Sequence, residues 1–196
     1  MHTLVLASNN PGKLRDYQTL ASPYPIHLIP QSTLNVPEAN ETGLTFIENA
    51  LIKARNAANF TQLPAIGEDA GLMVDGLNGA PGLYTARFAG QKASDTQNIQ
   101  KLLDELSKDP GCSRKARFYV VLALVNEPND PVPLICEGTW EGEILNEPTG
   151  TLGFGYLPVF YSYPHKQPAA LLPQEARNEA SHRGQAFQQL MKKYLK

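Results

Sequence analysis

The sequence predicts a mixed α/β or α+β fold whose sheet is partly antiparallel. In the N-terminal half, apolar segments of strand length alternate with amphipathic helical segments. Two β-rich segments, 116–125 and 133–145, then follow each other with no helical pattern between them. The chain of 196 residues, 42% hydrophobic and 18% charged, is long enough for one domain, or for two lobes around one cleft, with a sizeable core.

The first elements follow from local chemistry. Residues 2–8 are apolar and predict a short buried strand. A helix over 11–21 is predicted next, because Asn10 suits an N-cap and Pro11 suits the first helical position. Residues 26–31, "IHLIPQ", predict a second strand.

A longer helix is predicted over 45–60, where Thr45 and Glu48 have the spacing of a capping box. Its helical periodicity predicts a core face made of Ile47, Leu51, Ala54 and Ala58. The same periodicity predicts a polar stripe made of Asn49, Lys53 and Asn56.

The remaining elements follow in order. Residues 64–77 predict two strand segments separated by a break at 68–71. Ser94 is a candidate N-cap for a helix that runs to residue 108. A glycine-rich loop, 150–156, follows the two β-rich segments. The C-terminal segment 181–196 predicts an amphipathic helix with Phe187, Leu190, Met191 and Tyr194 facing inward.

Composition excludes several functional classes. The formal net charge of -2 argues against a long surface for a nucleic acid polymer. No apolar run is long enough to span a bilayer, and the N-terminus lacks the pattern of a signal peptide. Cys112 and Cys136 form no close metal-type pair and are expected to be reduced thiols. We therefore expect a cytoplasmic protein without a membrane partner.

The stretch "SNNPGK" is a candidate phosphate site at a strand-to-helix turn. A capped helix start exposes amides that favour anions, a glycine permits close approach, and a lysine adds a cation. The alternative is an ordinary capped helix with the lysine in solvent. The candidate residues are Ser8, Asn9, Asn10, Pro11, Gly12 and Lys13.

A second candidate site is acidic. Glu68 and Asp69 are adjacent between apolar segments, and Glu41 ends a polar loop before a helix. Carboxylates in such a position need solvent, a paired cation or a metal. Mg²⁺ prefers oxygen ligands, so two carboxylates and a phosphate could hold it, although a solvated turn explains the same residues.

The third candidate is a loop suited to a flat ligand. In "GFGY", glycines flank Phe154, and an aromatic ring in that setting can stack on a base. "SHR" opens a predicted helix with His182 and Arg183. A β-turn with a core aromatic, and a structural histidine, are the alternatives. Together, a phosphate turn, a metal pair, cations and a base-sized slot are the components of a nucleotide hydrolase.

With these motifs in order, the chain resembles the inosine/xanthosine triphosphate pyrophosphatases, which remove non-standard purine nucleotides. The resemblance covers nearly the whole chain and rests on five motifs: "SNNPGK", "ETGLTFIENALIKA", "GEDAGLMVDGLNGAPGLYTARFAG", "GTLGFGYLPVF" and "SHRGQAF". It implies a single domain, 1–196, of two α/β lobes with a long mixed sheet and a central nucleotide-binding cleft. It also implies a homodimer, Mg²⁺, and hydrolysis of a purine nucleoside triphosphate to the monophosphate and pyrophosphate.

The resemblance also implies roles for individual residues. Asp69 would be the proton acceptor and a metal ligand, Glu41 the second metal ligand, and Glu68 and Lys53 further catalytic residues. The substrate-binding residues it implies are the turn 8–13 and Ala70, Phe154, Gly155, Tyr156, Leu157, Arg177, His182 and Arg183.

Three departures from the family pattern bear on selectivity. The family reads Asp-Asp-Ser-Gly where this chain has Glu68, Asp69, Ala70 and Gly71. Leu157 replaces an aspartate after the "GFGY" motif, and Arg177 replaces a lysine. These changes leave two alternatives open: an enzyme with altered base preference, or a nucleotide-binding protein with weak turnover.

Overall fold

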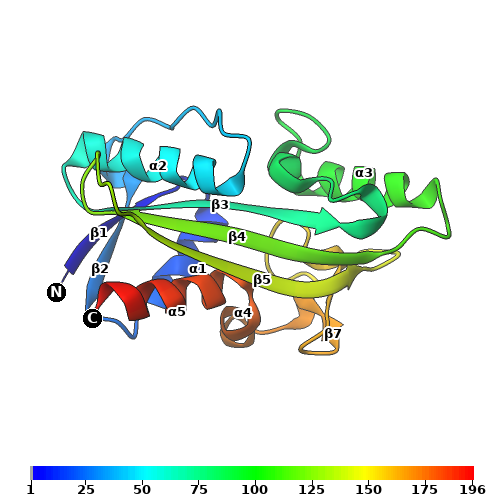
Figure 1. Cartoon of the computed structure of the whole chain (residues 1–196). Helices are drawn as coiled ribbons and strands as arrows, with labels where there is room; N and C mark the ends of the chain where they lie inside the picture. The colour runs from blue at the N-terminus through cyan, green and yellow to red at the C-terminus, as the bar shows by residue number, and fades with distance from the viewer. Residues whose placement is uncertain (1) are drawn as a thin grey trace. The chain divides into compact units, whose positions relative to one another are not determined.

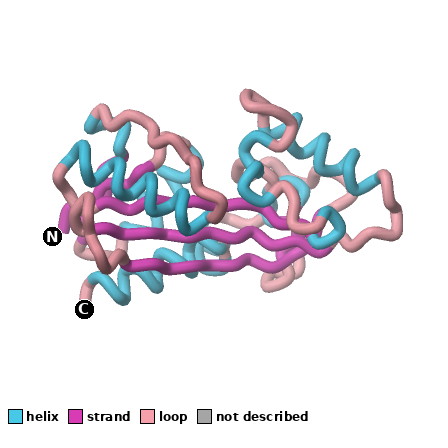
Figure 2. Tube along the Cα trace, turned by 45° about the horizontal axis from the view of Figure 1, so that its top comes forward, coloured by secondary structure: helices cyan, strands magenta, loops and turns pink. Residues whose placement is uncertain are grey.

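The computed structural model describes residues 2–196, and within them the strands form one mixed sheet in the order β2-β1-β3-β4-β5-β6-β7. β1 is parallel to both β2 and β3, whereas β6 is antiparallel to both β5 and β7. Figure 2 shows the long strands of the sheet running side by side. The predicted mixed, partly antiparallel sheet is therefore confirmed. The strands are β1 His2–Ala7, β2 Ile26–Pro30, β3 Ala65–Val74, β4 Lys115–Val125, β5 Leu134–Ile144, β6 Phe160–Ser162 and β7 Gln167–Pro168.

The predicted helices are present with nearly the expected bounds. The α-helices are α1 Pro11–Ala21, α2 Phe46–Thr61, α3 Asp95–Ser107, α4 Gln174–Ala180 and α5 His182–Tyr194. The short 3₁₀ helices are η1 Gln31–Leu34, η2 Asp75–Leu77, η3 Gly82–Arg87, η4 Leu157–Val159 and η5 Ala169–Leu171. In the described part of the chain, no helix is both long and apolar enough to cross a membrane.

The chain divides into two compact units. The first comprises residues up to Asp69 together with Val120–Gly138 and Arg183–Lys196, and the second comprises Ala70–Tyr119 and Thr139–His182. The division falls within β3, β4 and β5, each of which contributes residues to both units. Each unit has its own core and carries different predicted site residues.

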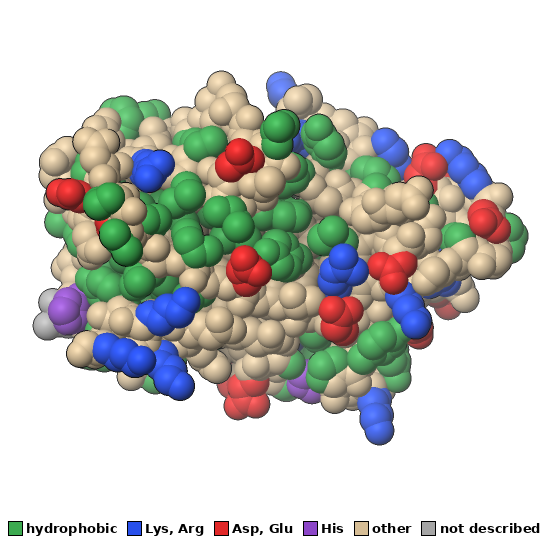
Figure 3. Space-filling view, in the orientation of Figure 1, with side chains coloured by type: hydrophobic (Ala, Val, Ile, Leu, Met, Phe, Trp, Pro, Cys, Tyr) green, Lys and Arg blue, Asp and Glu red, His purple; other side chains and the backbone are tan. Residues whose placement is uncertain are grey.

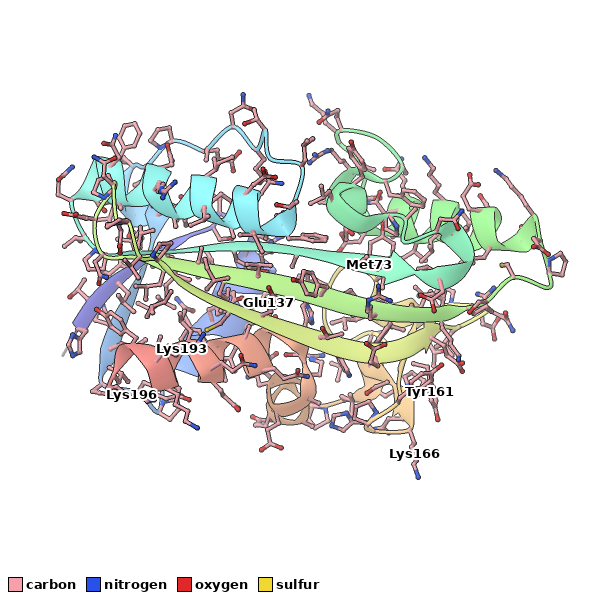
Figure 4. All side chains as sticks on the ribbon, in the orientation of Figure 1. Met73, Glu137, Tyr161, Lys166, Lys193 and Lys196 are labelled. Carbon is pink, nitrogen blue, oxygen red and sulfur yellow. The ribbon has the colours of Figure 1, made fainter. Side chains whose placement is uncertain are left out.

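In the first unit, α2 lies on one face of the strands, and α1 and α5 lie on the other (Figure 1). The apolar side chains of β1 are buried between these layers, and Tyr17 of α1 packs on Phe187 of α5 with ring centroids 5.6 Å apart. α2 approaches β3 closely because Gly67 has no side chain: a methyl group there would overlap the carbonyl oxygen of Ala50. Lys193 extends from α5 (Figure 4), and its ammonium donates to the Ile135 carbonyl of β5 at 2.9 Å.

The second unit is built around Trp140. Its ring packs on Phe160 and Phe118, with centroids 5.3 and 6.1 Å away. α3 lies on one face of the strands of this unit (Figure 1) and buries Ile99, Leu102 and Leu106 in the same cluster. The predicted cap of α3 is confirmed, since Ser94 and Gln97 form a reciprocal capping box.

Two sequence predictions are wrong. No break interrupts β3 at 68–71, because the two acidic side chains of this segment are held by cations and the strand continues to Val74. The predicted buried face of α2 is wrong in part. Ala54 and Ala58 are buried as predicted, but Ile47 is 38% exposed. Asn49, Ala50 and Ala57 are buried in addition, because the small alanines let the helix lie close to β3.

The surface carries charges of both signs. On the face drawn in Figure 3, lysine and arginine side chains are interspersed with acidic ones. This mixture matches the formal net charge of -2.

Candidate active site

Charged side chains from five segments of the first unit converge on the middle of β3. Lys13 comes from α1, Lys53 from α2, and Arg183 from the first turn of α5. They meet Glu41, Glu68 and Asp69, which come from the loop before α2 and from β3 itself. Lys13 and Arg183, which are 170 positions apart in the sequence, thus belong to one cluster of ion pairs, which we call the acid–lysine cluster.

The turn 8–13 takes the predicted form. Asn10 is the N-cap of α1, and its Oδ1 accepts from the amides of Gly12 at 2.9 Å and Lys13 at 3.1 Å. The Asn10 amide in turn donates to Ser8 Oγ at 3.3 Å. Pro11 occupies the first turn, where its missing N–H leaves no unsatisfied donor. The turn therefore has a fixed backbone that directs Lys13 toward the cluster.

Lys53 bridges two carboxylates. Its Nζ lies 2.8 Å from Asp69 Oδ1 and 3.2 Å from Glu41 Oε1. The other oxygen of Asp69, Oδ2, accepts from Asn49 Nδ2 at 3.3 Å. Asn49 is only 4% exposed, and its own Oδ1 accepts from the Gly43 amide at 2.9 Å. One turn of α2 therefore fixes both oxygens of Asp69 and the start of the loop that follows Glu41.

Glu68 holds the cations on the other side of the strand. Its side chain is fully buried, and its Oε1 lies 3.1 Å from Arg183 Nε and 3.5 Å from Lys13 Nζ. Arg183 also pairs with Asp16 of α1, with Nη1 3.6 Å from Oδ2. Burial alone would raise the pKa of Glu68, but the charges of Lys13, Arg183 and Lys53 outweigh it and lower that pKa.

The remaining pKa shifts suit acid–base work. Burial raises the pKa of Asp69 above its ordinary value, despite the opposing charge of Lys53. Burial lowers the pKa of Lys13, which the charge of Glu68 only partly restores. Burial also disfavours the charged form of Lys53, but Asp69 and Glu41 raise its pKa overall. Asp69 therefore binds a proton more readily than an ordinary aspartate, while Lys53 stays charged.

The cluster has the donor chemistry for a hard divalent cation. Four carboxylates, from Asp16, Glu41, Glu68 and Asp69, face the three cations Lys13, Lys53 and Arg183. Glu68 Oε2 is buried and has no hydrogen-bond partner among the described residues. Residues 2–196 contain no group of three or more His, Cys, Asp or Glu side chains placed to hold a metal on their own. Mg²⁺ fits such a site, since it commonly takes one or two carboxylates and completes its shell with water and phosphate oxygens.

The predicted base-reading loop lies in the second unit. Gly153 and Gly155 adopt φ values of 95° and 62°, which a glycine reaches without strain, so Phe154 stands between two left-handed residues. The Gly155 amide donates to Asp95 Oδ2 at 2.7 Å. The Tyr156 ring is buried, and its hydroxyl donates to the Thr85 carbonyl at 3.0 Å. The loop therefore has a defined backbone anchored at two adjacent residues.

Arg177 and Leu157 lie against the same loop. A side chain at position 153 would overlap Leu157 and would reach within 3.3 Å of Arg177 Nη1. Arg177 Nη2 donates to Gln174 at 2.7 Å, whereas Nη1 is buried and has no hydrogen-bond partner in the described structure. The His182 ring is 3% exposed and stacks on Phe118 with centroids 5.1 Å apart.

The structure thus brings the predicted catalytic and phosphate-binding side chains together in the first unit. Most of the residues predicted to bind the base lie in the second unit. Lys13, Lys53, Glu41, Glu68 and Asp69 form one cluster, as the sequence predicts. Arg183 joins this cluster through Glu68, while its neighbour His182 packs in the core of the second unit. Ala70 is the first residue of the second unit and continues β3.

Three residues that contact the predicted site residues were not predicted from the sequence: Asn49 and Asp16 beside the acid–lysine cluster, and Asp95 beside the loop of Phe154. Asn49 stands on the predicted polar stripe one turn before Lys53, and that spacing was a usable signal for a contact with Asp69. Asp16 and Asp95 gave no such signal, because their partners Arg183 and Gly155 are remote in the sequence.

Comparison with known proteins gives a consistent match over the whole length. The profile of the Ham1 family matches residues 4–193. The chain is 49% identical over 191 residues to a "dITP/XTP pyrophosphatase" from Shigella flexneri, covering 97% of each chain. It is 50% identical over 190 residues to a protein of the same name from Coxiella burnetii, covering 97% of this chain and 95% of that one.

Solved structures match equally well. A HAM1 protein from Coxiella burnetii superposes with a TM-score of 0.91 at 48% identity, covering 100% of this chain and 99% of that one. The Ham1 protein of Staphylococcus aureus superposes with a TM-score of 0.84 at 37% identity, covering 97% and 96%.

Proposed function

Because this chain belongs to the Ham1 family, we propose that it hydrolyses non-standard purine nucleoside triphosphates, dITP, ITP and XTP, to the monophosphate and pyrophosphate. It is a nucleoside triphosphate pyrophosphohydrolase, a hydrolase that acts on an acid anhydride. The single observation that carries this proposal is the acid–lysine cluster, where Lys53 joins Asp69 and Glu41 while Lys13 pairs with Glu68.

The chemical step needs a proton acceptor and stabilised phosphate charge. In our proposal, Asp69 takes a proton from water, the water oxygen bonds to the α-phosphorus, and the α–β phosphate bridge breaks to release pyrophosphate. The raised pKa of Asp69 makes its carboxylate a better base than an ordinary aspartate. Lys53 and Lys13 would offset the charge that develops on the phosphate oxygens. Glu68 holds Lys13 in place and is itself held by Arg183.

A metal ion would complete this site. We propose that Glu41 and Asp69, together with phosphate oxygens, hold Mg²⁺, which supplies charge neutralisation and a more acidic bound water. Lys53 is already 2.8 Å from Asp69 and keeps both carboxylates turned toward one point. The turn 8–13 would bind phosphate through Lys13 and its polar side chains, since two of its amides already donate to Asn10.

Base selection would come from the second unit. We propose that the purine stacks on Phe154 and that the loop backbone at Gly155, Tyr156 and Leu157 lines the base. Arg177 carries an unmatched donor, Nη1, which suits the 6-keto oxygen of hypoxanthine or xanthine. His182 and Arg183 would lie toward the same carbonyl edge, as the family pattern implies. Adenine presents an amino donor at that edge, so the site would disfavour ATP.

The direct test is a substrate panel. Pyrophosphate release from inosine, xanthosine, guanosine and adenosine triphosphates is measured with Mg²⁺ and with excess chelator. We expect Mg²⁺-dependent turnover that is fastest with the inosine and xanthosine substrates. Equal rates on all four would contradict base selection, and binding without Mg²⁺-dependent turnover would support the alternative of a nucleotide-binding protein.

A second candidate is an enzyme of the same chemistry with a shifted base preference. The observation that favours it is Leu157, an apolar residue beside the unmatched Nη1 of Arg177. An apolar side chain there removes a polar partner for the base, and such a loss can change discrimination by orders of magnitude. The same panel, extended to modified pyrimidine triphosphates, separates the two candidates.

The assembly and location of the protein are further proposals. We propose that the protein is a homodimer, as the family resemblance implies, and that it acts in the cytoplasm. Sedimentation equilibrium over a tenfold concentration range tests the dimer, and a sedimenting mass that stays at 21.5 kDa would contradict it.

A further inference from the structure

Asp95 contacts the loop of Phe154 from a distant part of the sequence. Its Oδ2 accepts from the Gly155 amide at 2.7 Å, across 60 positions in the chain. A short bond from an amide to an ionised carboxylate is stronger than one between neutral groups. Gly155 and Gly153 both have positive φ, so the backbone between them has alternative conformations open to it. The contact with Asp95 selects one of these conformations.

The next residue of the loop has a second anchor. The Tyr156 hydroxyl donates to the Thr85 carbonyl at 3.0 Å, and its ring belongs to the core of the second unit. Burial, together with the nearby charge of Asp95, raises the pKa of Tyr156, so the hydroxyl keeps the proton that it donates. Thr85 itself is fixed by its hydroxyl, which accepts from the Leu72 amide at 2.9 Å and donates to Gly82 at 2.6 Å.

The two anchors of the loop, Asp95 and Thr85, lie in segments that are hydrogen-bonded to each other. Asn98 of α3 is 2% exposed, accepts from the Ala89 amide at 2.8 Å and donates to the Ala86 carbonyl at 3.2 Å. The segment just after Thr85 is therefore bonded to α3, one turn beyond Asp95. Lys101, further along α3, donates to the Phe88 carbonyl at 2.6 Å. Asp95 and Thr85 thus keep a fixed separation, and the loop is bonded to both.

From this arrangement we propose that Asp95 is a positioning residue for base recognition. By fixing the Gly155 amide, it sets the direction of Phe154, the residue that precedes this amide. The inference rests on the proposed function, because the role of Phe154 as a stacking platform is part of it. Asp95 belongs to the second unit and is not a member of the acid–lysine cluster, so in this proposal its effect falls on the binding of the base rather than on the bond that breaks.

The test compares Asp95→Ala and Asp95→Asn with wild type. The measured quantities are kcat and KM for inosine and adenosine triphosphates at saturating Mg²⁺. We expect Asp95→Ala to raise KM for inosine triphosphate about tenfold and to reduce the preference over adenosine triphosphate similarly, with kcat changed less than about threefold. Asp95→Asn keeps an acceptor oxygen and should retain most of the preference.

The matched control is Asp104→Ala on the same helix. Asp104 accepts from Gln100 of α3 and lies on the exposed side, so its removal should leave KM and base preference unchanged. If Asp95 served only the stability of α3, Asp95→Ala would lower Tm but would leave the preference for inosine over adenosine triphosphate intact. An unchanged preference in a folded Asp95→Ala variant would overturn the proposal.

Hydrogen exchange tests the contact itself. The Gly155 amide should exchange at least about tenfold faster in Asp95→Ala than in wild type or Asp104→Ala, since its acceptor is gone. An unchanged exchange rate would overturn the proposal even if the enzyme is selective.

If wild type releases no pyrophosphate from any purine triphosphate, the proposed function fails first, and the role of Asp95 in base recognition fails with it. If wild type prefers inosine over adenosine triphosphate and Asp95→Ala keeps the same preference, the role of Asp95 is rejected while the proposed function stands.

Discussion

Lys53 and Asp69 form an ion pair of 2.8 Å between α2 and β3, and this pair joins the two halves of the proposed chemistry. Asp69 accepts the proton in the proposed reaction, and Lys53 carries the charge that would meet the phosphates. The same ammonium reaches Glu41 at 3.2 Å. One lysine therefore sets the distance between the proton acceptor and the second proposed metal ligand.

Removing the charge of Lys53 should impair turnover far more than folding. We expect Lys53→Met to lower kcat/KM for inosine triphosphate by about 10²- to 10³-fold, the loss typical of one electrostatic contact to a transition state. Thermal unfolding should shift by only a few degrees. Lys108→Met is the matched control, because Lys108 is exposed and pairs with Glu105 at 2.7 Å outside the acid–lysine cluster, so its loss should leave kcat/KM unchanged. A similar loss in both variants would contradict the role of Lys53.

The buried carboxylate of Glu68 should make stability depend on pH. Its pKa in the folded protein is lowered, so its stabilising contribution is present above the unfolded value of about 4.3 and is lost as the pH falls through the folded value. Glu68→Gln should lower the free energy of unfolding by about 3 kcal/mol at pH 7, because it leaves Lys13 and Arg183 buried without their carboxylate.

The measurement is urea unfolding of wild type and Glu68→Gln at pH 7 and below pH 4, in the presence of chelator. The difference between the two proteins should shrink at the lower pH, because below about 4.3 the unfolded chain binds a proton at Glu68 more readily than the folded protein does. Glu105→Gln, which removes a partly exposed carboxylate, should change stability by less than about 1 kcal/mol at either pH. A difference that is independent of pH would show that the charge of Glu68 is not the cause.

The close packing of α2 on β3 should not tolerate a methyl group at position 67. In Gly67→Ala the new carbon would overlap the Ala50 carbonyl oxygen and lie 2.6 Å from the Ala54 nitrogen. Both are backbone atoms, so the helix itself has to shift, and we expect a loss of about 3 kcal/mol or more in the free energy of unfolding. Activity should fall as well, because Lys53 moves with α2.

Gly111→Ala provides the control for that substitution. A methyl group there would meet only Asp109 Oδ1, at an ordinary 3.4 Å. Its effect on the unfolding free energy should stay within about 0.5 kcal/mol, measured by the same urea titration. Equal stability of the two variants would contradict the packing argument.

The unmatched donor of Arg177 should contribute to base selection. Arg177→Met should lower kcat/KM for inosine triphosphate about ten- to a hundredfold and leave that for adenosine triphosphate nearly unchanged, because only the 6-keto base accepts from the arginine. Arg117→Met removes a partly exposed arginine that pairs with Asp75 in the same unit and should alter neither value. A parallel fall on both substrates would assign Arg177 to structure rather than to the base.

Local sequence patterns predicted most of the elements well. The Asn10–Pro11 start placed α1 at its observed first residue, and Ser94 with Gln97 capped α3 as expected. These predictions succeed because caps and turns are decided by neighbours in the chain. The prediction of a break at 68–71 failed, because cations from other segments meet both adjacent acids in the strand: Lys13 and Arg183 pair with Glu68, and Lys53 pairs with Asp69.

Taken alone, the sequence determined the element types, the family resemblance and the identities of the acids and lysines in the proposed chemistry. Tertiary structure decided which partners these groups have. Glu68 pairs with Arg183, which is 115 positions away, and the Gly155 amide donates to Asp95. The physical reason is that the charge state and direction of a buried group depend on what surrounds it in space. A buried ion is acceptable only once a distant segment supplies its partner, and a glycine-rich loop with several open conformations is fixed in one of them by the group that binds its amide.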